Sequence, residues 1–134
     1  MNPLLGLARS RMELSRYQLG ADSCLAPKIV DCSSFTQWLF KECGTDIPRL
    51  AADQARMATR VPRLDIRPGD LIFMEGFCYR NVQGLPPDHV GHVGIIEENL
   101  RTFIHATHRP NGVTRGIIDR IPDWRFRFFA RIEI

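Results

Sequence analysis

Apolar residues at helical spacing follow a short polar segment near residue 31. Phe35, Trp38 and Leu39 recur at intervals of three and four, which places them on one face of a helix. The segment 31–34 before them reads Asp-Cys-Ser-Ser, and polar residues of these types favour the start of a helix. Gly44 is a suitable stop. The pattern therefore predicts a helix with Cys32 in its first turn.

The rest of the pattern places helices early in the chain and strands later. Loose helical spacing predicts a helix over 4–19, ending near Gly20, and an alanine-rich segment predicts another over 49–59. Two prolines make 61–68 a connector. Strands are expected at 71–74, 90–96, 101–107, near 113 and over 126–134. This order indicates an α+β fold in which N-terminal helices pack on an antiparallel sheet.

Length and charge narrow the classes of protein that fit. The 134 residues are enough for one domain with a hydrophobic core, so 1–134 is interpreted as a single domain. The net charge of +3 is spread along the chain. Its densest basic run, 125–131, alternates as a strand does, which favours a solvated sheet face over a nucleic-acid surface. No apolar run is long enough to span a bilayer, and residues 1–9 do not resemble a secretory signal.

Cys32 brings reactivity to the predicted helix. Unpaired N–H groups and the positive end of the dipole at a helix start favour an anion, so a thiol there spends more time as the nucleophilic thiolate. A small buried residue at a helix start is the simpler alternative. Cys24, Cys43 and Cys78 complete the set, and there is no C-x-x-C pair of the kind found in zinc ribbons or thioredoxin-like motifs. Disulfide pairing is left open.

His92 and His105 lie on either side of the predicted turn between two strands. A turn centred between Glu98 and Asn99 pairs the two histidines directly, so that both imidazoles project from one face of the sheet. One imidazole then suits a general base for a thiol, and the other suits the group that fixes its tautomer and tilt. Zinc bound by Cys32 and both histidines is an alternative, although no metal-ligand spacing is present.

Several segments, taken together and in order, resemble the NlpC-type cysteine peptidases, which are cell-wall hydrolases. The Asp-Cys-Ser-Ser-Phe segment at 31–35 is similar to their Asp-Cys-Ser-Gly-Phe signature, and 92–95 to their His-Val-Gly-Ile strand. The other matching segments are Tyr17 with Gly20, Pro48-Arg49 with Gln54, 67–73, 103–106 and Trp124-Arg125. The resemblance covers nearly the whole chain.

This resemblance implies a compact papain-like fold with Cys32 as nucleophile, His92 as general base and His105 as the orienting residue. The residues that it places around the substrate are Tyr17, Asp31 and Ser33. In such family members the tyrosine assists at the oxyanion, while the aspartate and serine bind a free amino end of the peptide. The substrates that it implies are peptidoglycan stem peptides, cut at γ-D-glutamyl bonds to diaminopimelate or lysine. We expect a monomer without cofactor, metal, nucleic-acid partner or membrane span.

Departures from the family pattern keep other interpretations open. Ser34 replaces the usual glycine, which is expected to narrow the cleft beside the thiol, and Ala21 replaces a glycine near Tyr17. A thioester-mediated acyltransferase with the same triad, or an inactive cell-wall binding module, are alternative functions. The expected place of action is the cell envelope after export or processing, otherwise the cytoplasm.

The loop 75–88 departs furthest from the family. It holds two glycines and two prolines and runs into the strand that carries His92. We expect it to form one wall of the substrate cleft, with Arg80 suited to a substrate carboxylate. A solvated surface loop is the alternative. His89, just after it, and His108 are interpreted as bystanders.

Overall fold

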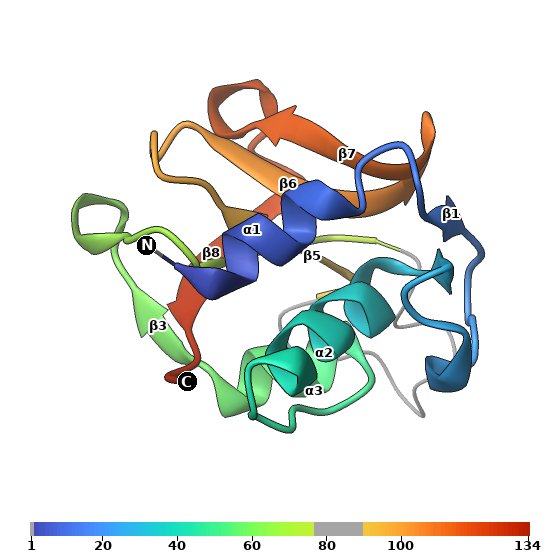
Figure 1. Cartoon of the computed structure of the whole chain (residues 1–134). Coiled ribbons are helices and arrows are strands. Elements are labelled where there is room, and N and C mark those ends of the chain that lie inside the picture. The colour runs from blue at the N-terminus through green and yellow to red at the C-terminus, as the bar shows by residue number, and fades with distance from the viewer. Residues whose placement is uncertain (1, 77–89) are drawn as a thin grey trace.

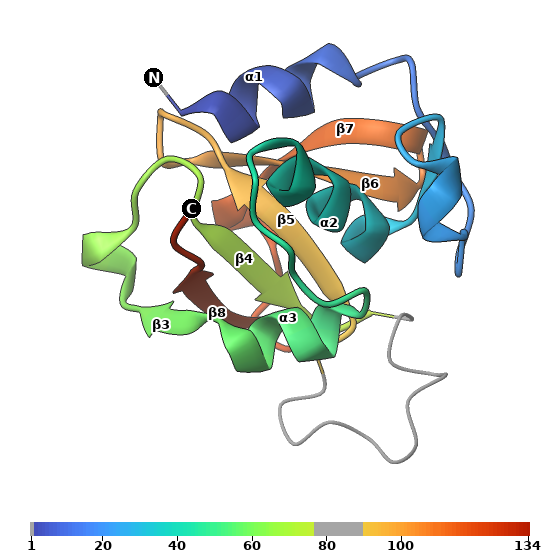
Figure 2. The ribbon, with the colours of Figure 1, turned by 60° about the horizontal axis from the view of Figure 1, so that its bottom comes forward.

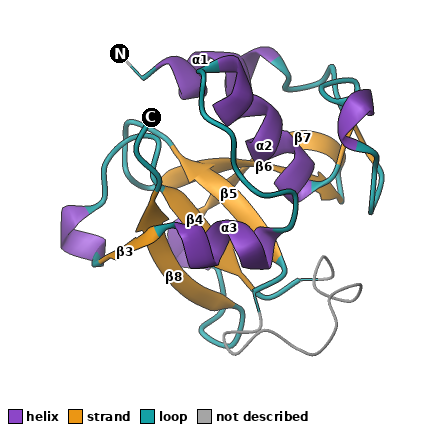
Figure 3. Ribbon diagram, turned by 90° about the horizontal axis from the view of Figure 1, so that it is seen from below, coloured by secondary structure: helices purple, strands orange, loops and turns teal. Residues whose placement is uncertain are grey.

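A six-stranded antiparallel sheet forms the centre of the structure, a computed structural model that describes residues 2–76 and 90–134. The strand order is β3-β8-β4-β5-β6-β7, and each neighbouring pair is antiparallel. The strands are β3 (Thr59–Val61), β4 (Leu71–Met74), β5 (His92–Ile96), β6 (Thr102–His108), β7 (Asn111–Ile117) and β8 (Phe126–Arg131). Together with the helices in front of the sheet, they confirm the expected α+β class (Figure 3).

The α-helices of the described residues lie on one side of this sheet, as Figures 1 and 2 show. They are α1 (Pro3–Ser10), α2 (Cys32–Glu42) and α3 (Ala51–Met57). α2 packs on β5 and β6 and also contacts the other two helices. Its fully buried Phe35, Leu39 and Phe40 join a core shared by the helices and the sheet. The helix that begins at Cys32 is thus held from several sides. No helix in the described ranges has the length and apolarity needed to cross a membrane.

The other face of the sheet carries a second apolar cluster. Side chains alternate between the two faces of a strand, so Leu71 and Phe73 of β4 pack under the helices while Ile72 and Met74 point the other way. The second cluster consists of Ile66, Ile72, Met74, Ile96, Phe103, Ile118 and Phe129. β4 is buried along its whole length, because both of its faces are covered.

The expected helix over 4–19 is wrong beyond Ser10. The chain turns after α1, with Glu13 at a φ of 68°, and Leu14 is exposed. The backbone then extends as β1 (Arg16–Tyr17), which pairs in parallel with β2 (Ile29–Val30). This pairing supplies hydrogen bonds that helical spacing alone does not reveal, and it places Tyr17 beside the main sheet.

Other element boundaries also differ from the sequence expectations. β3 forms where a helix end and a connector were predicted, because its residues pair with β8. β7 is longer than the short strand expected near 113, since it pairs with β6 along its whole length. β8 ends at Arg131 rather than at 134, and Phe129 on its second face is buried as well. α2 was predicted correctly: it begins at Cys32, and Gly44 follows its end with a φ of 88°.

The hairpin between β5 and β6 has a register two residues away from the one expected. Ile96 pairs with Phe103. The turn therefore covers 98–101, and a hydrogen bond of 2.9 Å from the backbone N–H of Glu97 to the carbonyl oxygen of Thr102 closes it. The direct pairing of His92 with His105 is therefore wrong. A shift of two residues nevertheless preserves the alternation of faces, so both histidines still project from the same face.

A buried carboxylate ties α1 to this hairpin. Glu97 accepts hydrogen bonds from Arg9 Nε at 3.1 Å, Arg115 Nη2 at 2.9 Å and the hydroxyl of Thr102 at 2.7 Å. Arg9 also pairs with Glu98. The hydrogen bonds from Arg115, ahead of those from Thr102 and Arg9, lower the pKa of Glu97 to about 2.

Glu97→Gln is expected to lower the free energy of unfolding at pH 7 by about 1–3 kcal/mol, because two guanidinium groups lose their carboxylate. Since the pKa of Glu97 falls from 4.5 to about 2 on folding, its stabilisation is lost as the pH drops through that window. In urea unfolding, the gap between parent and variant should therefore shrink from pH 5 to pH 2. The exposed Glu42→Gln is the matched control. Equal stability of Glu97→Gln and the parent at pH 7 would contradict this assignment.

Candidate active site

The start of α2 is fixed by a reciprocal pair of side-chain caps. The carboxylate of Asp31 accepts the backbone N–H of Ser34 at 2.9 Å, and the hydroxyl of Ser34 accepts the backbone N–H of Asp31 at 2.9 Å. This capping box sets Cys32 as the first residue of the helix. Ser34 is buried, and its hydroxyl completes the cap. Its expected narrowing of the cleft beside the thiol stays a prediction.

Arg49 and Gln54 brace the same turn from the segment that follows α2. Arg49 donates from Nη2 to Asp31 Oδ2 at 2.7 Å and from Nη1 to Ser33 Oγ at 2.9 Å. The fully buried Gln54 donates to Ser33 O at 2.9 Å and accepts from Thr36 Oγ1 at 2.7 Å. Arg49 and Gln54, which belong to the family-like Pro-Arg and glutamine segment, therefore support the first turn of α2.

Asp31 and Ser33 lie inside this network of supporting hydrogen bonds. Asp31 is only 2% exposed and Ser33 is fully buried. The Asp31 carboxylate also accepts the backbone N–H of Gly20 at 3.1 Å and the Ser33 hydroxyl at 3.3 Å. Both side chains therefore have protein partners in this structure, and their contact with a substrate's amino end stays a prediction.

Cys32 meets the sheet at the point where β5 begins. Its side chain is buried in the core shared by helices and sheet. Its Sγ lies 3.8 Å from the carbonyl oxygen of Gly91, the residue directly before His92. Because α2 packs along β5, the helix start and the first histidine are held by two rigid elements rather than by loops.

The two histidines contact each other, as the sequence predicted, despite the shifted register. His92 Nε2 and His105 Nδ1 are 2.7 Å apart, and the rings meet edge to face with centroids 5.0 Å apart. Phe103 packs edge-on against the other side of His105, with centroids 4.7 Å apart. The hydrogen bond needs one proton between the two nitrogens, so it couples the two tautomers: when His92 Nε2 donates, His105 Nδ1 accepts, and when His105 Nδ1 donates, His92 Nε2 accepts.

Burial keeps both rings neutral near pH 7. Burial, followed by the positive charge of His105 and then that of Arg125, holds the pKa of His92 well below its ordinary value of 6.5. Burial, followed by Arg125, lowers the pKa of His105 to about 4. A neutral imidazole is the form that accepts a proton, so His92 is in the state that a general base requires.

A pocket of about 460 Å³ opens beside His92. Its lining residues are Tyr17, Glu75, Gly76, Gly91, His92, Thr107, His108, Arg109, Pro122, Trp124 and Arg125. Tyr17 is held there by Asn111, whose side chain bonds the backbone N–H of Tyr17 at 3.0 Å and its carbonyl at 3.1 Å. His108, which the sequence placed as a bystander, lies in this wall with its ring 6.1 Å from that of Tyr17.

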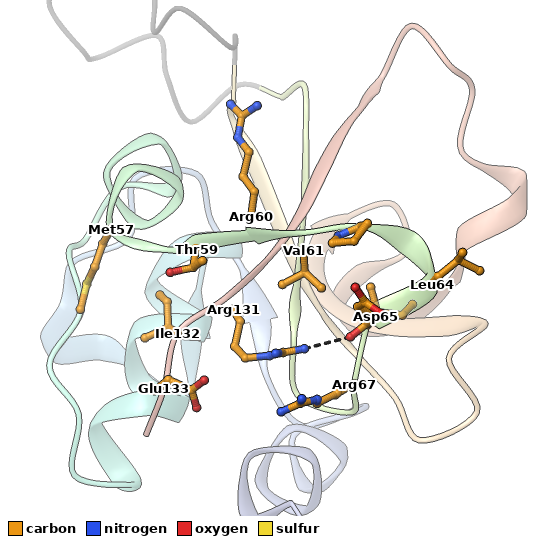
Figure 4. Close-up of a pocket in the computed structure, with 12 residues that line it drawn as sticks. Met57, Thr59, Arg60, Val61, Leu64, Asp65, Arg67, Arg131, Ile132 and Glu133 are labelled. Carbon is orange, nitrogen blue, oxygen red and sulfur yellow. Dashed lines mark hydrogen bonds between the residues drawn. The ribbon is translucent and has the colours of Figure 1, made fainter.

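A larger hollow of about 710 Å³ lies away from these residues, between β3, the turn 63–65 and the end of β8 (Figure 4). The described residues that line it include no cysteine or histidine. Arg131 there binds the Asp70 carboxylate through Nε at 2.7 Å and the backbone oxygen of Asp65 at 3.0 Å. Size alone would favour this hollow, but His92 and Gly91, whose carbonyl contacts the Cys32 thiol, line the smaller pocket, which makes that pocket the candidate site.

The metal alternative, the other cysteines and the loop 75–88 remain to be placed. Among the described residues, no group of three or more His, Cys, Asp or Glu side chains is arranged to hold a metal ion. Cys24 is an exposed thiol and Cys43 a half-buried one, and both are free. Cys78, His89 and most of the loop 75–88 lie outside the described residues, so the expected role of this loop stays a prediction.

The α+β fold brings a cysteine at a helix start close to a hydrogen-bonded pair of histidines beside a pocket. These features define a protein with a candidate cysteine–histidine active site. Comparison of the sequence with known families narrows the class further. The model of the NlpC/P60 family matches residues 15–123, and the chain belongs to this family.

Relatives with curated names share this family. The chain is 34% identical over 115 residues to murein DD-endopeptidase MepS/murein LD-carboxypeptidase of Escherichia coli K12, covering 84% of this chain and 52% of that protein. It is 42% identical over 65 residues to a γ-D-glutamyl-L-lysine dipeptidyl-peptidase of Bacillus subtilis strain 168, covering 48% of this chain and 20% of that protein. The chain thus spans about half the length of the first relative.

Solved structures show the same fold. An NlpC/P60 family protein from Bacillus cereus aligns with a TM-score of 0.75 at 24% identity, covering 96% of this chain and 39% of that one. The peptidoglycan hydrolase RipB from Mycobacterium tuberculosis aligns with a TM-score of 0.73 at 23% identity, covering 98% of this chain and 64% of that one. At these identities the likeness establishes the fold.

Proposed function

We propose that this chain is a cysteine peptidase that hydrolyses amide bonds in peptidoglycan stem peptides, at γ-D-glutamyl bonds to diaminopimelate or lysine. The observation that carries the proposal is the His92–His105 hydrogen bond of 2.7 Å beside the helix start that holds Cys32. Family membership supports it, since the matched relatives bear the names of a murein endopeptidase and a γ-D-glutamyl-L-lysine peptidase.

The proposed reaction runs in two steps through a thioester. If His92 Nε2 donates to His105 Nδ1, the Nδ1 of His92 is left as an acceptor for the proton of the Cys32 thiol. The thiolate attacks the amide carbon, and the resulting imidazolium returns the proton to the departing amine. A water molecule, deprotonated by His92, then hydrolyses the thioester. The helix start provides a positive electrostatic environment for the oxyanion, and Tyr17 lines the adjacent pocket.

The test is incubation of the purified protein with defined muropeptides, followed by mass measurement of the fragments. Cleavage at a γ-D-glutamyl bond is expected, with a gain of one water per bond. Products that carry the acyl group on an added amine would indicate acyl transfer instead. Binding of muropeptides without any fragment would indicate an inactive binding module and would overturn the proposed function.

A further inference from the structure

The pocket beside His92 has a strongly basic wall. Arg109 is exposed and Arg125 is half-buried, and both line the pocket next to Trp124, which is 67% exposed. Among the described residues of this lining, Glu75 is the acidic one, and its carboxylate pairs with Arg127 at 3.1 Å. Among the described residues, neither Arg109 nor Arg125 forms an ion pair with a carboxylate.

Arg125 is held close to the reacting groups. Its Nε donates to the backbone oxygen of Glu75 at 3.4 Å, where the chain leaves β4. The positive charge of Arg125 contributes to the lowered pKa of both His92 and His105. A half-buried guanidinium that keeps donors available beside a pocket suits a planar anion.

We propose that Arg125, assisted by Arg109, forms a carboxylate-binding subsite that selects anionic peptides and sets them against His92. This inference rests on the proposed function. In a γ-glutamyl amide the side-chain carboxyl forms the scissile bond, so the α-carboxylate stays free and lies only a few bonds from the reacting carbon. The residue after the scissile bond can also carry a carboxylate, and this second carboxylate could bind the same arginines. Trp124 then offers an apolar surface for the aliphatic chain between the two charged groups.

The test uses three synthetic peptides that share the scissile amide. One carries both carboxylates, and in each of the others one carboxylate is converted to the amide. The parent protein is expected to cleave the fully charged peptide with a kcat/KM about 10- to 100-fold above that of one amidated peptide, as for a charge-assisted hydrogen bond. The amidated peptide that loses rate identifies which carboxylate is bound.

Arg125→Gln should reduce this preference at least about tenfold, and Arg109→Gln should reduce it less, because Arg109 is more exposed. The readout is the ratio of kcat/KM for the charged peptide to kcat/KM for the amidated peptide. Any effect of the substitution on the histidines cancels in this ratio, because the histidines act on both peptides alike. Arg101→Gln is the control: it changes the net charge equally, on an exposed side chain before β6 that does not line the pocket. It should keep the ratio of the parent.

The same peptides are titrated calorimetrically into Cys32→Ala and into Cys32→Ala combined with Arg125→Gln. Weaker binding of the amidated peptide to the first protein, and no discrimination by the second, support the subsite even if the parent cleaves nothing and the proposed function fails. Cleavage of all three peptides with equal kcat/KM, or a parent-like ratio in Arg125→Gln, would overturn the subsite while leaving the hydrolase intact.

Discussion

Cys32→Ala is expected to abolish cleavage of muropeptides, with a loss in kcat of at least about 10⁴-fold. The thiolate is the only group in the proposed mechanism that forms a bond to the substrate carbon, so no neighbour can replace it. The fold should survive, because alanine fits the space of a buried cysteine and the caps on α2 come from other residues. Fragment masses report activity, and circular dichroism reports the fold.

Cys24→Ala is the matched control for this variant. Cys24 is exposed and lies outside the pocket beside His92, so its loss should leave cleavage unchanged. Retained cleavage by Cys32→Ala, in a preparation free of other hydrolases, would remove Cys32 as the nucleophile.

Alkylation gives an independent measurement of the same assignment. A hydrogen bond with Asp22 raises the pKa of the Cys24 thiol, and burial raises the pKa of the Cys43 thiol. Both should therefore react slowly with iodoacetamide near pH 6. Peptide mass mapping is expected to find Cys32 labelled before either of them, and the opposite order would contradict its role.

The local chemistry of the site was predictable from the sequence. Helical spacing and a polar start located the helix that opens at Cys32, because a capping box uses residues that are close together in the chain. Alternation in two neighbouring strands brought His92 and His105 to one face. That prediction tolerated an error of two residues in the register, since such a shift does not change the face.

The features that sequence reasoning missed depend on contacts between distant segments. Tyr17 was assigned to a helix, because nothing local reveals that its backbone bonds to Asn111 across the fold. The sequence pattern likewise does not reveal that Arg49 pairs with the carboxylate of Asp31, which belongs to a different segment. The basic pocket wall likewise joins a residue after β6 to one before β8, and neither segment alone indicates a binding site.

His92→Ala is expected to lower kcat/KM by about 10²–10⁴, the usual effect of losing a general base. His105→Gln should cost less, because its amide can still form a hydrogen bond with His92 and keep the ring oriented. His105→Ala should fall between the two. Retention of full activity by His92→Ala would exclude the proposed triad, and stoichiometric zinc in the purified protein would restore the metal alternative.

The pH dependence of kcat/KM tests whether the base is the buried ring of His92. Burial, with the charges of His105 and Arg125, lowers the pKa of His92 below 6.5, so the ring stays neutral as the pH falls through that value. An exposed histidine would be about one tenth neutral at pH 5.5, with a comparable loss of rate. The parent should instead keep kcat/KM at pH 5.5 within about twofold of that at pH 7. An acid limb with its midpoint at or above pH 6.5 would show that the proton is accepted elsewhere.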